Sequence, residues 1–300
     1  MDIATTGAGH RQENLPLGAL LTTAAFFCVS LVTVLAKITS PYASVGVILL
    51  FQNVMCLLLV LPVVLRGGWS GLRTQRFGMH LLRAVMGTAC WYAIFFAITL
   101  IPLTNAILLA YSAPLWMPLI AWAVSRTRIS NATWLGAALG FAGIVLVLQP
   151  QGHGLGLGYV AAVASAVFLA VAMMSVRWLG ATEPVSRILF YYFLLSSGLL
   201  LPVAVVEWTP IPSVAWPWLV AIGLAQLFSQ ALIAIAYRYA SAEKVGPFIY
   251  SVIVFTALFE WVLWHHAPGP IVILGMALVI GGGLVAMRAR KKSTGRASAL

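Results

Sequence analysis

Residues 111–122 read YSAPLWMPLIAW, and residues 250–261 read YSVIVFTALFEW. The two segments share their Tyr-Ser start, one leucine and a final tryptophan at a constant shift of 139 positions, from 111 to 250. Single identities between apolar segments arise by chance, but a nearly constant shift along the chain indicates two repeats. Further identities at a shift of 139 or 140 are Ala97 with Ala236, Leu135-Gly136 with Leu274-Gly275, Gly143 with Gly282, and Leu61-Pro62-Val63 with Leu201-Pro202-Val203, and the shift of 140 also pairs Lys37 with Arg177.

The composition assigns these segments to a membrane. Of the 300 residues, 62% are hydrophobic and 8% are charged, whereas soluble domains carry about 25% charged residues. This composition excludes a soluble enzyme, a disordered chain and a secreted disulfide scaffold. A spanning helix needs about 20 apolar residues and satisfies its own backbone hydrogen bonds in lipid. The sequence predicts ten such helices, at residues 15–38, 44–65, 78–99, 103–125, 132–149, 156–179, 185–206, 214–237, 243–264 and 269–288.

The basic residues predict how these helices are oriented. With the N-terminus in the cytoplasm, 16 of the 17 Lys and Arg residues fall in cytoplasmic loops, tails or span ends, and only Lys37 lies outside. Because basic loops stay on the cytoplasmic side, we expect an inner- or plasma-membrane protein with both termini in the cytoplasm. The net charge of +11 then requires no nucleic-acid partner. The Arg288–Lys292 run is expected to contact anionic lipid headgroups.

Repeat and orientation together define the expected domains. These are a cytoplasmic tail at 1–14, a first repeat at 15–150, a second repeat at 151–288 and a basic cytoplasmic tail at 289–300. Because five helices is an odd number, the second repeat enters the membrane from the opposite side. Inverted repeats are typical of secondary transporters, which bind substrate between the repeats. The expected fold is therefore an all-α polytopic membrane protein with ten transmembrane helices in two inverted five-helix repeats.

Several motifs are similar to those of a known family. They read RAVMGT at 83–88, FAITLIPLTNAILL at 96–109, SAPLW at 112–116 and LGAALGFAGIVL at 135–146, with echoes in AIAYRYA at 234–240 and LGMALVIGGG at 274–283. Over residues 15–290 the chain resembles EamA-like members of the drug/metabolite transporter superfamily. The resemblance implies two inverted repeats and movement of small metabolites such as amino acids across the inner membrane. Relatives carry other solutes, including nucleotide-like and vitamin-like molecules.

The chain departs from the family pattern at three places. A glutamate that often follows the fourth and ninth spans is missing from Ser125-Arg-Thr-Arg-Ile and from His265-His-Ala-Pro. The second span carries Gln52-Asn53 where the family often has an arginine. Anion-binding or coupling roles tied to those charges therefore do not carry over residue by residue.

Polar side chains inside the spans are candidates for a substrate path, because they are costly in lipid. Gln226 and Gln230 share one helix face, as do Thr88 and Trp91. Such residues would line a neutral cavity with aromatic walls, suited to a ring or an alkylammonium group. Alternatively they join helices through hydrogen bonds of about 0.6 kcal/mol each. The candidates are Gln52, Asn53, Thr88, Trp91, Asn105, Ser112, Trp116, Tyr192, Gln226, Gln230 and Tyr250.

Three charged residues in or near the spans each have two possible roles. Glu260 is the only acidic residue well inside a span; it is a candidate for proton coupling, or a partner for Lys37. Arg83 could attract a substrate carboxylate, but extension of its side chain to the inner headgroups is the favoured interpretation. Lys37 has the same ambiguity at the outer side.

No cofactor or metal is expected. The three cysteines, Cys28, Cys56 and Cys90, form no CxxC pair, which makes a metal or redox role weak. Adjacent His265 and His266 lack further ligands. The glycine run at 152–158 lacks the GxGxxG spacing of a phosphate loop. The glycines at 136, 140, 143 and 281–283 are instead expected to permit close helix contact.

The sequence favours a secondary transporter of amino acids or related amphipathic solutes, acting as an exporter or exchanger. An uptake carrier for a nucleotide-like or vitamin-like metabolite is the alternative within the same class. An intramembrane lipid-modifying enzyme is the alternative from another class, and it would need an acid–base or nucleophile constellation. The spans offer only His80, at a span end, and one well-embedded acid. A role as an enzyme is therefore not expected.

Overall fold

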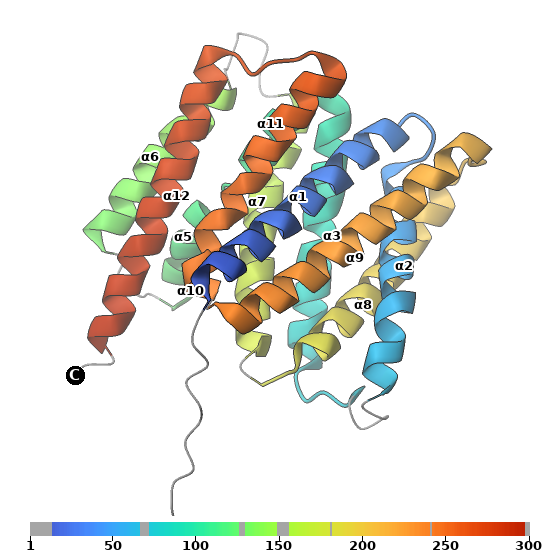
Figure 1. Cartoon of the computed structure of the whole chain (residues 1–300), viewed down its shortest axis with the longest axis horizontal. Helices are drawn as coiled ribbons and strands as arrows, with labels where there is room; N and C mark the ends of the chain where they lie inside the picture. Colours follow the sequence, from blue (N-terminus) through green and yellow to red (C-terminus); the bar gives the residue numbers. More distant parts are fainter. Residues whose placement is uncertain are drawn as a thin grey trace, which may run out of the picture.

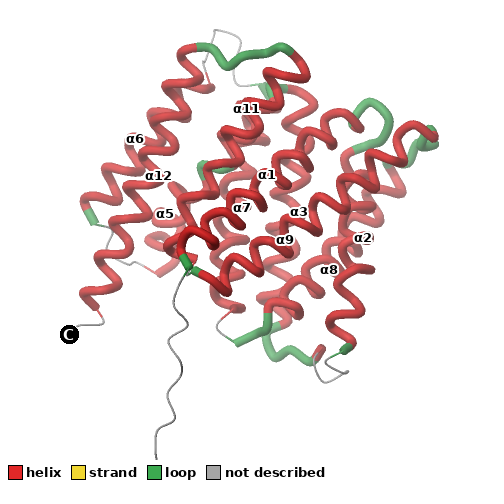
Figure 2. Tube along the Cα trace, in the orientation of Figure 1, coloured by secondary structure: helices red, strands yellow, loops and turns green. Residues whose placement is uncertain are grey.

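The computed structural model describes residues 14–66, 72–125, 130–148, 156–180, 182–240 and 242–297, with side chains left undescribed at 124–125, 242–243 and 286–297. The described residues form helices joined by short loops (Figure 2). The helices are α1 (Leu15–Thr39), α2 (Val45–Leu65), α3 (Phe77–Leu100), α4 (Leu103–Ala110), α5 (Ala113–Ser125), α6 (Asn131–Leu148), α7 (Leu157–Gly180), α8 (Val185–Val206), η2 (Ser213–Ala215), α9 (Trp216–Tyr239), α10 (Ala242–Val245), η3 (Gly246–Tyr250), α11 (Ser251–Trp264) and α12 (Pro270–Ala297).

The expected polytopic all-helical architecture is confirmed. Within the described ranges, nine helical segments are long and apolar enough to cross a membrane, and Pro270–Val285 of α12 is a shorter tenth. The start of α1 follows local capping rules, because Asn14 accepts a hydrogen bond from the Leu17 amide at 3.1 Å and Pro16 occupies the first turn. In Figure 1, α1 begins and α12 ends on the same side of the bundle.

Two predicted spans are interrupted rather than continuous. The span expected at 103–125 divides at Tyr111-Ser112 into α4 and α5, and the span expected at 243–264 divides into α10, η3 and α11. Pro114 and Pro247 lie in the first turns after these breaks, and proline has no amide hydrogen to continue the preceding helix. Both interruptions therefore lie beside the Tyr-Ser pairs of the two repeats.

Helices from the two halves of the chain pack against each other in pairs. The most extensive contacts join α6 with α12, α1 with α9, α3 with α7, and α2 with α8. In Figure 1, α6 and α12 form the left flank, and α1 and α9 cross the centre. These pairs stay the same when each helix is replaced by its counterpart in the other half of the chain. The counterparts of α1 and α9 are α7 and α3, which also form a pair, and in the α2–α8 and α6–α12 pairs the two members are each other's counterparts.

Small residues permit the closest of these contacts, as expected. A methyl group added at Gly143 would lie 2.7 Å from the carbonyl oxygen of Gly275, and one at Gly282 would lie 2.6 Å from the backbone nitrogen of Gly140. The backbones of α6 and α12 therefore approach directly. Gly281 differs, because a methyl group there would meet nothing within 4 Å.

Candidate functional site

Buried amide side chains lie on either side of a contact between α2 and α9. The Cys56 thiol lies 3.7 Å from the Gly223 carbonyl oxygen and joins the two helices. Gln52 lies one turn before Cys56, and Gln226 lies one turn after Gly223. Asn53 donates to the Leu49 carbonyl at 2.7 Å, but its side-chain oxygen and those of both glutamines are buried without a hydrogen-bond partner. Because such groups normally find partners, these three acceptors are available to a ligand.

Other predicted residues are already engaged within the protein. The Thr88 hydroxyl donates to Ser196 on α8 at 2.8 Å, and Trp91 packs edge-on against Phe95. The Asn105 amide lies 3.4 Å from the Tyr159 hydroxyl. The Thr88 and Asn105 contacts join helices, so they fit the alternative interpretation of polar groups as links between helices, whereas Trp91 and Phe95 both lie on α3. Gln230 is half-buried one turn beyond Gln226.

The helix breaks hold the remaining uncharged candidates. The Ser112 hydroxyl donates to the Leu109 carbonyl at 2.6 Å and closes the end of α4. Trp116 stacks edge-on against Phe141, with its indole nitrogen buried and without a partner. The Tyr250 hydroxyl is also buried without a partner, and it faces Gly283 of α12. Two donors therefore lie unused beside the interrupted helices.

Tyr192 lies under the guanidinium of Arg83. The Arg83 Cζ atom is 4.2 Å from the centre of the Tyr192 ring. The favoured prediction of extension toward the headgroups is wrong, because the guanidinium turns along α3 to Gly87, one turn further into the bundle. The sequence could not predict this orientation, because an arginine side chain near the end of a span can extend either toward the headgroups or into the bundle.

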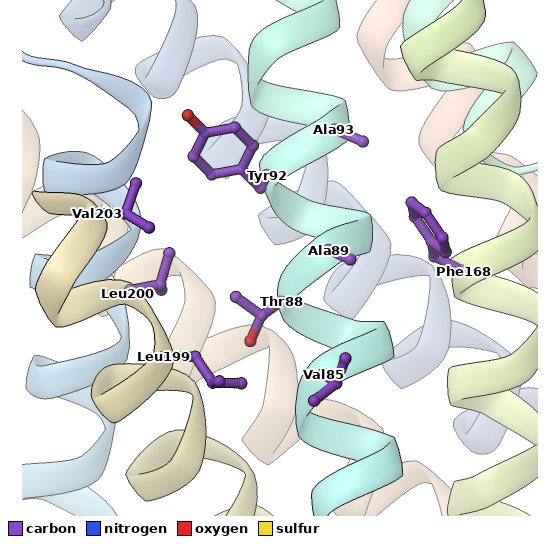
Figure 3. Close-up of a pocket in the computed structure, with 9 residues that line it drawn as sticks. All are labelled: Val85, Thr88, Ala89, Tyr92, Ala93, Phe168, Leu199, Leu200 and Val203. Atoms are coloured by element: carbon purple, nitrogen blue, oxygen red, sulfur yellow. The ribbon is translucent and has the colours of Figure 1, made fainter. Parts of the chain in front are cut away.

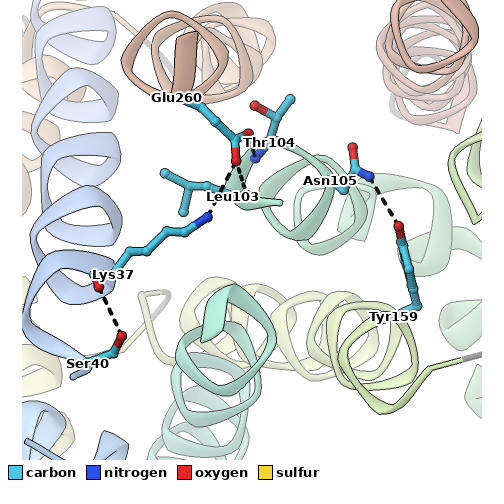
Figure 4. Close-up of polar contacts among 7 residues, drawn as sticks. All are labelled: Lys37, Ser40, Leu103, Thr104, Asn105, Tyr159 and Glu260. Carbon is cyan, nitrogen blue, oxygen red and sulfur yellow. Dashed lines mark hydrogen bonds and ion pairs between the residues drawn. The ribbon is translucent and has the colours of Figure 1, made fainter. Parts of the chain in front are cut away.

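The Glu260 carboxylate is buried and bonded to two other helices. It is 3% exposed and accepts the Leu103 and Thr104 amides at 2.7 Å each (Figure 4). The Lys37 ammonium approaches it at 3.4 Å and lies 5.1 Å from the centre of the Trp264 ring. A carboxylate at a helix N-terminus is stabilised by free amides and by the helix dipole. We call Lys37, Glu260 and the first turn of α4 the latch, and their side of the bundle the α4 end.

Two further carboxylates that were not predicted as site residues join helices. Glu207 accepts from the Tyr92 hydroxyl at 2.6 Å and from the Gly46 amide at 3.1 Å. Glu183, at the opposite side of the bundle, accepts from Thr74 at 2.7 Å and pairs with Arg187 at 2.5 Å. Desolvation acts to raise the pKa of Glu183, but these hydrogen bonds and the charges of Arg187 and His80 hold that pKa below its ordinary value. Both acids lie at span ends, where the sequence does not distinguish a bonded carboxylate from a solvated one.

A hollow of about 500 Å³ opens between α3, α7 and α8. Figure 3 shows Val85 and Tyr92 on α3, Phe168 on α7 and Leu199 on α8 around it. Of the predicted residues, only Thr88 is on its wall. The hollow is therefore apolar, and the unpartnered amide oxygens lie elsewhere.

The polar groups form three sets along the bundle: the amides of α2 and α9, the Arg83–Tyr192 pair and the latch. Metal-ligating residues do not add to them, since no group of three or more His, Cys, Asp or Glu residues occurs in the parts of the chain that the structure describes. The residues expected to contact lipid, 288–292, and most of the glycine run at 152–158 lie outside the described side chains.

Comparison with known proteins identifies relatives over nearly the whole chain. The sequence model of the EamA-like transporter family matches twice, at residues 16–149 and 156–288. A pseudopaline exporter of Pseudomonas aeruginosa is 28% identical over 93% of this chain and 99% of the relative. A riboflavin transporter of Vibrio cholerae is 28% identical over 90% and 92%, and an S-adenosylmethionine uptake transporter of Rickettsia prowazekii is 23% identical over 79% and 80%. A solved crystal structure that is 23% identical has a TM-score of 0.62 and covers 91% of this chain and 98% of its own.

Proposed function

This chain belongs to the EamA-like transporter family, and from that premise we propose that it moves small amphipathic metabolites across the inner or plasma membrane by alternating access. The family and the relatives are transporters of small molecules, and the helices are those of an integral membrane protein. Transport, and not enzymatic lipid modification, is therefore the function class. The identity of the substrate and the direction of transport are proposed in the paragraphs below.

The proposal includes two inverted repeats, 15–150 and 151–288. It is supported by the family model's two successive matches and by helix pairs that are exchanged between the halves. The interrupted spans at corresponding places add to this support, because discontinuous helices at equivalent positions are typical of transporter binding regions. With both termini in the cytoplasm, as the basic residues favour, the α4 end faces outward.

The main evidence for the position of the substrate path is the three unpartnered amide oxygens on α2 and α9. Gln52, Asn53 and Gln226 are each at most 3% exposed, yet their oxygens lack donors. A buried acceptor without a partner costs about 1–3 kcal/mol, so a bound solute with N–H or O–H groups would recover that energy. We assign these residues to the path, with Thr88, Trp91, Trp116, Tyr192, Gln230 and Tyr250 beside it.

The direction of transport is proposed as export or exchange. The relatives include an exporter and uptake transporters, so an uptake carrier for a nucleotide-like or vitamin-like metabolite is the alternative. Purified protein in liposomes, loaded with unlabelled amino acids, nucleosides or riboflavin, would be tested for counterflow of the labelled compound. Saturable accumulation of one class supports the proposal and names that class. Absence of counterflow for every class, with folded protein in the vesicles, contradicts it.

Glu260 is proposed as the coupling residue. Protonation would remove the charge that Lys37 and two α4 amides now stabilise, and so would release the latch. Accumulation by the wild type is then expected to respond to an imposed pH gradient. Glu260→Gln should retain counterflow and lose that response. An unchanged pH response in this variant would assign coupling elsewhere.

The amide assignment is tested by Gln226→Ala. We expect transport to fall about tenfold, the equivalent of one hydrogen bond to a polar or charged solute, while membrane insertion stays normal. Gln75→Ala, in an exposed loop before α3, is the matched control and should transport like the wild type. Normal transport by Gln226→Ala would remove this residue from the path.

A further inference from the structure

Arg83 carries a positive charge in the membrane-spanning part of the bundle and has no counter-ion among the side chains that the structure describes. The two ion pairs among the described side chains are Lys37 with Glu260 and Arg187 with Glu183. The Nε atom of Arg83 is buried and has no hydrogen-bond partner. Charged side chains inside a membrane are costly and generally find partners or line a path. The arginine is therefore short of both a negative charge and an acceptor.

The surroundings of Arg83 hold the guanidinium inside the bundle. Its Cζ atom lies 4.2 Å from the Tyr192 ring centre, a cation–π arrangement that holds the group over the ring. Gly87 provides the space, because a methyl group there would collide with the guanidinium and would lie 2.6 Å from the Tyr192 ring. Without a side chain at 87, Arg83 can fold along α3 instead of extending to the helix start.

The arginine is connected to the unpartnered Gln226 amide through α2. Cys56 of α2 and Tyr192 of α8 belong to the same buried cluster of side chains. The Cys56 thiol contacts the Gly223 carbonyl, and Gln226 follows one turn later on α9. A cation that needs an anion and an amide oxygen that needs a donor therefore occur along one line of contacts from α3 to α9.

We propose that Arg83 and Tyr192 form a carboxylate subsite, and that the substrate is a zwitterionic solute whose N–H groups face the amide oxygen of Gln226. The guanidinium edge offers paired donors that match a carboxylate. One cation suits one negative charge, so a monocarboxylate is favoured over a phosphate dianion. This inference rests on the proposed transport function and narrows its substrate class.

Counterflow of solutes that differ only at the carboxyl group tests the subsite. The panel contains labelled amino acids, the corresponding primary amides, and phosphomonoesters of similar size. The wild type is expected to exchange at least one acid, and to exchange its amide about 10- to 100-fold less efficiently, as loss of a charged hydrogen-bonded contact predicts. Exchange of a phosphomonoester in preference to every acid would overturn the carboxylate assignment.

Variants at position 83 separate charge from packing. Arg83→Gln should exchange the acid and its amide equally, whereas Arg83→Lys, which keeps the charge but lacks the planar group, should recover part of the preference. Arg177→Gln neutralises an exposed arginine at the end of α7 and should behave like the wild type. Unchanged preference for the acid in folded Arg83→Gln would overturn the subsite.

The outcomes for the wild type distinguish this proposal from the transport function. Exchange of amides without preference for acids would leave the transporter intact and would refute the carboxylate subsite. Absence of exchange for every acid, amide and phosphomonoester would refute the subsite, and counterflow of nucleosides and riboflavin would then decide the transport function. Only a preference for acids that depends on position 83 supports the subsite.

Discussion

The two interrupted spans differ in how their first half-helix is held. At the α4 end, α4 is a regular eight-residue helix whose first amides are bonded by Glu260. At the other end, which we call the α10 end, α10 has four residues and continues as the 3-10 helix η3. The shift of 139 places Ala121 of α5 opposite Glu260 of α11, and alanine cannot accept those hydrogen bonds. One repeat therefore has a latch that the other lacks, which gives the two ends of the proposed path different stabilities.

The largest effect is expected when the latch is destroyed. Glu260→Ala leaves two α4 amides and the Lys37 charge without their acceptor, and removal of one partner from a buried pair costs about 3–5 kcal/mol. Because Lys37 is 21% exposed, we expect the lower part of that range. The thermal midpoint in detergent should fall by several degrees. A midpoint equal to that of the wild type would show that the latch does not stabilise this conformation.

Transplanting the latch is expected to have the next largest effect. Ala121→Glu would place a carboxylate on α5 at the position that corresponds to Glu260. If the repeats are equivalent, it should stabilise closure of the α10 end and slow counterflow several-fold, about 1 kcal/mol in activation free energy. Ala121→Gln is the matched uncharged control. Equal rates for the glutamate variant, the glutamine variant and the wild type would contradict the equivalence of the two ends.

A smaller difference is expected between Lys37 and its repeat partner Arg177. Lys37 contacts both Glu260 and the Trp264 ring, so Lys37→Met should cost about 1 kcal/mol. Arg177 is exposed, and Arg177→Met should change stability by less than about 0.5 kcal/mol. Thermal midpoints of the two variants, measured side by side, test this contrast. Equal losses would mean that the asymmetry lies elsewhere.

The smallest effect concerns Glu183, a carboxylate on the side of the α10 end. Because its pKa is lowered in the folded protein, its stabilisation is present above the ordinary value of 4.5 and is lost as pH falls through the folded pKa. The difference in stability between wild type and Glu183→Gln, of about 0.2–1 kcal/mol, should stay constant from pH 8 to pH 6. A difference that disappears in this interval would assign another titrating group to the contact.

The sequence predicted the spans well, because apolar runs of about 20 residues have one solution in lipid. The interruptions at Tyr111 and Tyr250 were missed, since hydropathy does not change where a helix breaks inside the membrane. The Glu260–Lys37 pair was among the alternatives, but the α4 amides bonded to Glu260 lie 156 and 157 positions away in the chain. Arg83 required the structure, because only the packing of Gly87 and Tyr192 decides which way its side chain turns.

The central claim is that the two ends open alternately and that the latch holds one of them closed. Pulsed electron paramagnetic resonance can measure both ends with spin-label pairs at corresponding exposed positions, Tyr42 with Leu100 and Thr182 with Tyr239, after replacement of Cys28, Cys56 and Cys90. Glu260→Gln should lengthen the 42–100 distance and shift the 182–239 distance toward shorter values. Lengthening at both ends together, or no change at either end, would contradict the account.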